Sequence, residues 1–221
     1  AFPELDARVH MVKPFTPPVT WPRYGGHDWG FAHPWAFVDY AVDEDGIIWV
    51  VDTTKGRRMK DSDIGERIVS RAPVDRMETI WAGPDVFNQI KARNEDGPAP
   101  QTSERYLERG LIVTRANTDR AQGFRTIREL LAWRGNGPGG IDTEPQLRLM
   151  DTPGNRWLFQ QLESAVMDPD DPESVLKVDA NEDGVGGDDA LDALRYGVHS
   201  RPRVARETWF DRQWNINDPD V

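Results

Sequence analysis

The chain has 221 residues, nine tryptophans, no cysteine and a formal net charge of −11. The lack of cysteine excludes a disulfide framework and a thiolate metal site, and no run of about 18 apolar residues could span a membrane. An acidic chain is a poor match to a protein that coats nucleic acid, but the acidity is compatible with an enzyme that cuts it. The chain also opens without the basic and apolar segments of a signal peptide.

Residues 1–20 are rich in proline and predict an extended lead-in or linker. Three strands are then expected, at 23–29, 35–42 and 47–52. The Asp45-Gly46 pair is a hairpin signal between the second and the third strand. The third strand is continuously apolar and therefore central. These three strands with short connections predict an antiparallel meander at the start of the domain.

Strands and helices alternate in the rest of the chain. Further strands are expected at 78–82, 111–114 and 147–150, and helices at 61–71, 119–133, 155–166 and from residue 189 onward. Such alternation places helices on both faces of a mixed sheet. We predict one α/β domain over 21–200, followed by a C-terminal tail at 201–221.

Several aspartates stand at the ends of these elements. Asp189 and Asp192 share one helical face, and neighbouring carboxylates repel each other unless a cation lies between them. Asp28 and Asp85 each follow an expected strand, and Asp52 ends another. Taken singly, each is typical of a turn or a helix cap. Because ligands bind outside strand ends in open α/β sheets, the aspartates together predict one site.

Oxygen ligands without cysteine favour Mg²⁺ or Mn²⁺. Two such ions about 4 Å apart can activate a water and stabilise the leaving oxygen in phosphodiester cleavage. The four histidines are scattered, and the chain contains neither a Gly-x-Ser-x-Gly motif nor a glycine-rich phosphate loop ending in Lys-Ser or Lys-Thr. These features favour a two-metal nuclease and give no sign of an ATPase.

The chain resembles the C-terminal nuclease domain of the large terminase subunit of tailed bacteriophages. The resemblance spans about residues 21–200, with the elements in the family's order. It is carried by segments 24–30, 33–36, 45–52, 81–85, 110–113, 116–131 and, most specifically, 188–197 (Asp-Asp-Ala-Leu-Asp-Ala-Leu-Arg-Tyr-Gly).

This resemblance implies a ribonuclease H-like fold and an endonuclease that cuts concatemeric viral double-stranded DNA during genome packaging. Asp28, Asp85, Asp189 and Asp192 would be catalytic, and these four with Asp188 would hold the metal ions. Some relatives have His and then Asp three residues apart where this chain has Asp189 and Asp192. Which of Asp188, Asp189 and Asp192 binds metal directly therefore stays open.

The same resemblance implies the setting in which the protein works. Its partners would be a packaging ATPase domain, a portal protein and a small terminase subunit, in the cytoplasm of the host cell and without a membrane. Arg57, Arg58 and Lys60, which follow the third strand, are candidate contacts to the DNA backbone. An ordinary solvated charged loop explains the same three residues.

Two alternative functions are open at this point. A ribonuclease H-like resolvase or transposase core would use the same carboxylates. A non-enzymatic calcium-binding module would use the loop Asp179-x-Asn181-x-Asp183-Gly184, which begins like an EF-hand. The twelfth position of that loop, which should be acidic, is Ala190.

Overall fold

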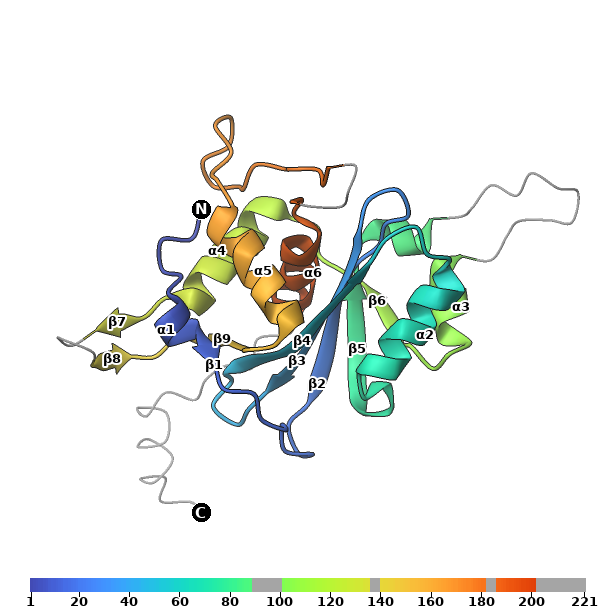
Figure 1. Ribbon diagram of the computed structural model, residues 1–221, viewed down its shortest axis with the longest axis horizontal. Coiled ribbons are helices and arrows are strands. Elements are labelled where there is room, and N and C mark those ends of the chain that lie inside the picture. The colour runs from blue at the N-terminus through green and yellow to red at the C-terminus, as the bar shows by residue number, and fades with distance from the viewer. Residues whose placement is uncertain (89–100, 136–139, 182–185, 202–221) are drawn as a thin grey trace, which may run out of the picture.

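The structure is a computed structural model, and it describes residues 1–88, 101–135, 140–181 and 186–201 (Figure 1). Its centre is a seven-stranded sheet in the order β1-β9-β4-β3-β2-β5-β6. The strands are β1 (Met11–Val12), β2 (Arg23–Asp28), β3 (Trp35–Val42), β4 (Ile48–Gly56), β5 (Met77–Ala82), β6 (Val113–Arg115) and β9 (Leu147–Met150). Strands β2, β3 and β4 are antiparallel, and the other neighbours in the sheet are parallel. The predicted mixed sheet is confirmed.

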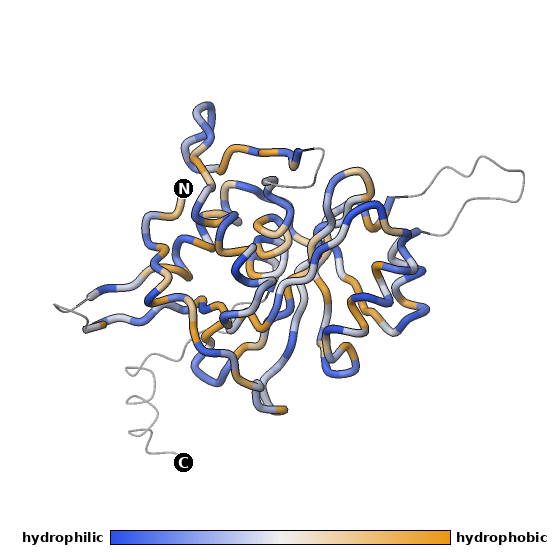
Figure 2. Tube along the Cα trace, in the orientation of Figure 1, coloured by the Kyte–Doolittle hydropathy of each residue, from blue (hydrophilic) through white to orange (hydrophobic). Residues whose placement is uncertain are grey.

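Helices cover both faces of this sheet. On one face lie α2 (Asp61–Arg71) and α3 (Thr102–Leu107); on the other lie α4 (Arg120–Leu131), α5 (Pro153–Ser164) and α6 (Asp189–Ser200). The side chains of β3 alternate between two cores, Trp35 and Phe37 on the α2 side and Val38 and Tyr40 on the α6 side. All eight residues of β3 are buried, because both faces of the strand are covered. Orange and blue alternate along α2 and α4 in Figure 2, as expected of helices with one buried face.

Several expected elements have the predicted bounds or differ by a few residues. The strands at 35–42 and 147–150 and the helix at 61–71 match. Strand β4 continues four residues beyond Asp52, since its pairing with β3 extends to Gly56 opposite Trp35. Helix α5 starts two residues earlier than expected, because the Thr152 hydroxyl accepts a hydrogen bond from the Asn155 amide at 3.1 Å.

The expectation of an extended lead-in does not hold for residues 1–12. They form a short helix, α1 (Ala7–His10), and then β1, which pairs with β9 in parallel. Phe2 is buried against Phe124, with the ring centroids 6.2 Å apart. The first residues of the chain therefore belong to the folded domain.

Smaller elements also differ from the expectation. Residues 89–100 lie outside the described residues, and α3 begins soon after them at Thr102. The chain also contains two short 3₁₀ helices and a small hairpin: η1 (Val74–Arg76), η2 (Pro84–Phe87), β7 (Arg134–Gly135) and β8 (Ile141–Thr143). Most of the expected tail lies outside the described residues as well. No helix in the described ranges is long and apolar enough to cross a membrane.

Candidate active site

The site is built where α6 lies directly on β2. A Cβ atom at Gly26 would lie 2.0 Å from the carbonyl oxygen of Ala193, so only glycine permits this approach. The Tyr40 hydroxyl fixes the far end of the helix by donating to the Gly197 carbonyl at 3.0 Å. Asp28 lies two residues after Gly26 and therefore on the same face of the strand. The packing brings the first turn of α6 next to Asp28.

Four carboxylates meet at this junction. Asp28 is half-buried at the end of β2, and Asp188, Asp189 and Asp192 are buried at the start of α6. Desolvation raises the pKa of Asp28 well above its ordinary value, and the negative charges of Asp192, Asp189 and Asp188 raise it further. Arg195 opposes this shift. Burial likewise raises the pKa of Asp189 to about 6. The structure thus brings together four of the five predicted metal-binding residues.

Two arginines that the sequence analysis did not single out neutralise part of this charge. Arg120 contacts both carboxylate oxygens of Asp192 at 2.9 Å and Asp188 at 2.7 Å. Arg195 donates to Asp192 at 3.0 Å. A signal for Arg195 was present, because Asp189, Asp192 and Arg195 follow one another at three-residue spacing on one helical face. Arg120 comes from α4, and its place could be seen only once the helices were packed.

Asp85 stands apart from the buried cluster. It lies in η2, is exposed, and accepts a hydrogen bond from the Asn88 side chain at 3.0 Å. Strands β2 and β5 are parallel neighbours, so their carboxyl ends lie side by side. Asp85, which follows β5, therefore lies at the same end of the strands as Asp28. Asp52 has a different place, since it lies within β4 and accepts from the Thr152 hydroxyl at 2.6 Å, beside the start of α5.

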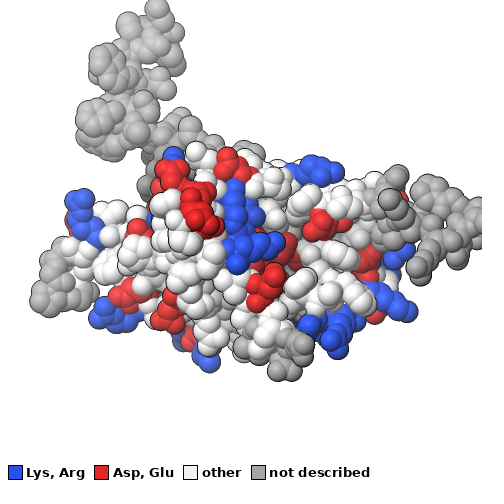
Figure 3. All heavy atoms as spheres, turned by 90° about the horizontal axis from the view of Figure 1, so that it is seen from above, with Lys and Arg blue, Asp and Glu red and all other residues white. Residues whose placement is uncertain are grey.

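The three candidate DNA contacts also lie at this end of the strands. Arg57, Arg58 and Lys60 follow β4, which runs parallel to β2. Arg57 donates to the Ala32 carbonyl at 2.8 Å, which ties the loop to the segment between β2 and β3. Arg58 and Lys60 are exposed. Figure 3 looks onto this side of the molecule and shows Lys and Arg side chains between groups of Asp and Glu.

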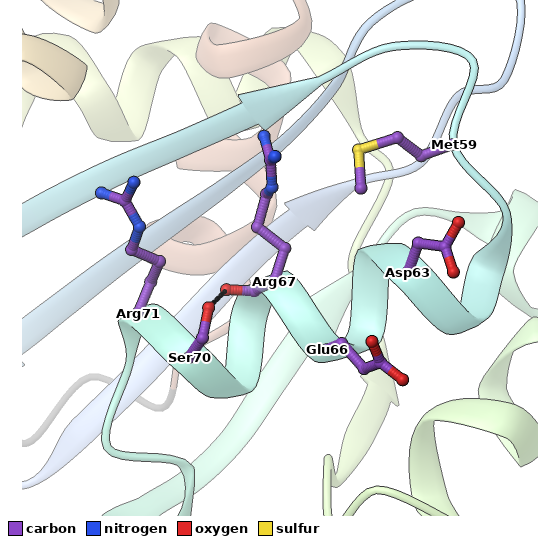
Figure 4. Close-up of a pocket in the computed structure, with 6 residues that line it drawn as sticks. All are labelled: Met59, Asp63, Glu66, Arg67, Ser70 and Arg71. Atoms are coloured by element: carbon purple, nitrogen blue, oxygen red, sulfur yellow. Dashed lines mark hydrogen bonds between the residues drawn. The ribbon is translucent and has the colours of Figure 1, made fainter.

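A shallow hollow on the opposite face of the sheet is a poor alternative site. Figure 4 shows the side chains that line it along α2, among them Asp63, Glu66, Arg67 and Arg71. Asp63 and Glu66 are exposed, and no buried carboxylate lies among the lining residues. The hollow therefore lacks the crowded, desolvated acids that distinguish the α6 junction.

The donors at the α6 junction fit a divalent ion of a particular kind. No three His, Asp or Glu side chains in the described part of the chain are arranged to enclose a metal by themselves. Magnesium, however, is commonly bound by one or two carboxylates and completed by water and phosphate oxygens. Asp28 and Asp189 suit that role, because Oδ2 of Asp189 is buried without a hydrogen-bond partner among the described residues. Asp188 and Asp192 are already paired with Arg120.

The calcium-loop alternative is weakened at its closing position. Asp183 and Gly184 lie outside the described residues. Ala190, which would have to supply the closing carboxylate, is buried in α6, and its amide donates to Oε1 of Gln161 at 2.9 Å. That position offers no side-chain oxygen for a calcium ion.

No protein-family model and no curated protein matches the sequence. Among solved structures, the nuclease domain of the P22 large terminase matches with a TM-score of 0.61 and 16% identity over 87% of both chains. The large terminase of the thermophilic bacteriophage D6E matches with a TM-score of 0.61 and 16% identity over 88% of this chain but 43% of that protein. The chain therefore spans less than half of the D6E protein. At this identity the likeness establishes the fold alone, and it confirms the predicted ribonuclease H-like fold.

Proposed function

We propose that the chain is a metal-dependent endonuclease that cuts concatemeric viral double-stranded DNA during genome packaging. The observation that carries the proposal is the cluster of the half-buried Asp28 with the buried Asp188, Asp189 and Asp192 at the end of β2. The likeness in fold to terminase nuclease domains supports the choice of reaction. Two Mg²⁺ or Mn²⁺ ions are the proposed cofactors.

The residues of the cluster would have different roles in holding the metal and in positioning one another. A bound divalent ion would supply Lewis-acid stabilisation and a water with lowered pKa. Asp28 and Asp189 would hold that ion, one from the sheet and one from α6. Arg120 and Arg195 would keep Asp192 in place, since Arg120 donates to both of its carboxylate oxygens and Arg195 to one of them. Asp85, exposed on the neighbouring strand, would join the site as a further ligand when DNA and metal are bound.

The proposed setting follows from the same likeness. The enzyme would act in the host cytoplasm together with a packaging ATPase domain, a portal protein and a small terminase subunit. Its substrate would be ordinary duplex DNA, which separates this proposal from a resolvase that prefers branched DNA. A four-way junction assayed beside linear duplex would distinguish the two substrates.

The proposal is tested by the cutting of supercoiled plasmid in Mg²⁺, Mn²⁺, Ca²⁺ or EDTA. We expect cutting in Mg²⁺ and Mn²⁺ only, and a loss of at least about 1000-fold in Asp189→Asn, which keeps the shape of the side chain but removes a carboxylate that would hold the ion. Asp142→Asn removes an exposed carboxylate on β8 and is the matched control. Cutting that persists in EDTA, or that Asp189→Asn leaves intact, would contradict the proposal.

A second prediction concerns the loop after β4. Replacing Arg57 and Arg58 together by alanine should weaken duplex binding and lower the slope of log affinity against log salt by about 0.9 for each lost phosphate contact. Binding measured in Ca²⁺ over a range of salt concentrations gives this slope. Arg71→Ala, an exposed arginine at the end of α2, serves as the control. An unchanged slope would mean that this loop does not contact DNA and is an ordinary solvated segment.

A further inference from the structure

A lysine stands beside the carboxylate cluster without having been assigned a role. Lys55 lies near the end of β4, where Ala36 of β3 is its direct partner, and Ala36 is in turn the partner of Asp28. The side chains of directly paired residues point to the same face of a sheet. Those of Asp28, Ala36 and Lys55 therefore lie in a row across three neighbouring strands, on the α6 side. With adjacent strands about 4.8 Å apart, the Asp28 and Lys55 backbones are roughly 10 Å from each other.

The residue between them is small. Ala36 is buried in the core on the α6 side and carries a single methyl group, so no bulky side chain of β3 stands between Asp28 and Lys55. A larger side chain there would separate Asp28 from Lys55. A carboxylate and an ammonium group therefore lie on the same face of the sheet, two strands apart, with only a small side chain between them.

The direction of the Lys55 side chain is set by its contacts. Its ammonium nitrogen lies 4.1 Å from the centre of the Trp157 ring on α5, a cation–π contact. Burial lowers the pKa of Lys55, while the nearby charge of Asp189 opposes that shift. The residue is otherwise exposed, so a ligand arriving from solvent can reach it.

We propose that Lys55 is a catalytic residue whose ammonium group contacts a non-bridging oxygen of the phosphate that is cut. The inference rests on the proposed nuclease function. It adds Lys55 to the residues that were given a role in that function. Lys55 forms no covalent bond and transfers no proton in this role. Its charge stabilises the negative charge that develops on the phosphate oxygens. The cation–π contact with Trp157 positions the ammonium group for this role.

The test compares Lys55→Met, which keeps the chain length and removes the charge, with Lys55→Arg and with Lys13→Met, an exposed lysine after β1. At saturating plasmid in Mg²⁺, Lys55→Met should cut about 100-fold more slowly, Lys55→Arg should recover part of that loss, and Lys13→Met should match the wild type. Lys55→Gln replaces the methionine variant if that variant does not fold.

Two further readouts do not depend on cutting. The rise in Tm that Mn²⁺ produces should persist in Lys55→Met, because the substitution removes a charge that repels the ion. The salt slope of duplex binding in Ca²⁺ should fall by about 0.9, the value of one phosphate contact. A Lys55→Met variant that loses the Mn²⁺ response would show that Lys55 shapes the metal site instead, and this would overturn the phosphate contact.

Failure of this inference is distinguishable from failure of the proposed function. Wild-type cutting that Lys55→Met leaves unchanged, together with an unchanged salt slope, overturns the role of Lys55 alone. A wild-type protein that neither cuts DNA nor is stabilised by Mn²⁺ overturns the nuclease proposal, and the inference with it.

Discussion

Asp28→Asn is expected to abolish DNA cutting and, in metal-free buffer, to make the protein more stable. The loss of cutting should be at least about 1000-fold, since about 4 kcal/mol of Lewis-acid stabilisation corresponds to three powers of ten in rate. The gain in stability has a separate cause. An ionised Asp28 is desolvated among three other aspartates, and asparagine relieves that repulsion without changing the shape of the side chain.

The stability gain should depend on pH in a defined direction. The pKa of Asp28 in the folded protein is raised above its ordinary value of 3.8, so below that pH the carboxyl is protonated in both states and costs nothing. As the pH rises, the unfolded chain releases the proton first, and the folded state loses stability until the pH passes the folded pKa. The advantage of Asp28→Asn should therefore be near zero at pH 3.5 and grow as the pH rises.

Thermal or urea unfolding in EDTA at several pH values measures this difference. Each unit by which the pKa is raised corresponds to about 1.4 kcal/mol, and 1 kcal/mol to about 2–4 °C in Tm for a chain of this length. Asp142→Asn should change neither stability nor cutting. A destabilised Asp28→Asn variant at neutral pH would mean that the carboxylates at the α6 junction are not crowded as described.

Gly26→Ala is expected to have the largest effect on stability. The new Cβ atom would lie 2.0 Å from the backbone carbonyl of Ala193, so the helix has to move away from the strand. Overpacking against a backbone group that cannot rotate aside should cost about 3 kcal/mol or more. That is a fall of roughly 6–12 °C in Tm. The displaced helix should also separate Asp189 from Asp28, and cutting should be lost in the fraction that stays folded.

The matched control for this variant is Gly46→Ala. Gly46 has a positive φ of 80°, but no atom lies within 4 Å of the position that its Cβ would occupy. Alanine there costs about 1–2 kcal/mol of local backbone strain and touches neither β2 nor α6. It should leave cutting per folded molecule unchanged. Normal cutting by Gly26→Ala would show that the close approach of α6 is not needed to assemble the site.

The elements with a strong local pattern were predictable from sequence. The helix at 61–71 has apolar residues at helical spacing, and the strand at 35–42 is a short, mostly apolar run; both matched. Asp189 was correctly placed at the start of a helix. Segments whose stability comes from distant partners were not predictable. The strand β1 has two residues and exists because β9 offers an unpaired edge, and Phe2 is ordered by Phe124, more than a hundred residues away.

That several acids of the candidate site lie together was predictable to the same extent, while their catalytic role stays a prediction. The acidic character of Asp28, Asp189 and Asp192 identified them, because three carboxylates near element ends are costly without a reason to be together. Their neighbours were not identified, since Arg120 and Lys55 reach the cluster through helix packing and strand register. An ordinary lysine at the end of a strand carries no local sign of what lies two strands away.

The pairing of β1 with β9 is also expected to protect the protein from self-association. In the described part of the chain, the two-residue strand β1 is the one strand beyond β9 in the sheet. It satisfies backbone groups of Leu149 and Met150 that would otherwise face solvent. Exposed strand edges are templates for pairing with other molecules. A shortened version of the chain that starts after Val12 would uncover the β9 edge and the apolar surface beneath Phe2. Such a fragment is expected to aggregate, even though all residues of the carboxylate cluster are retained.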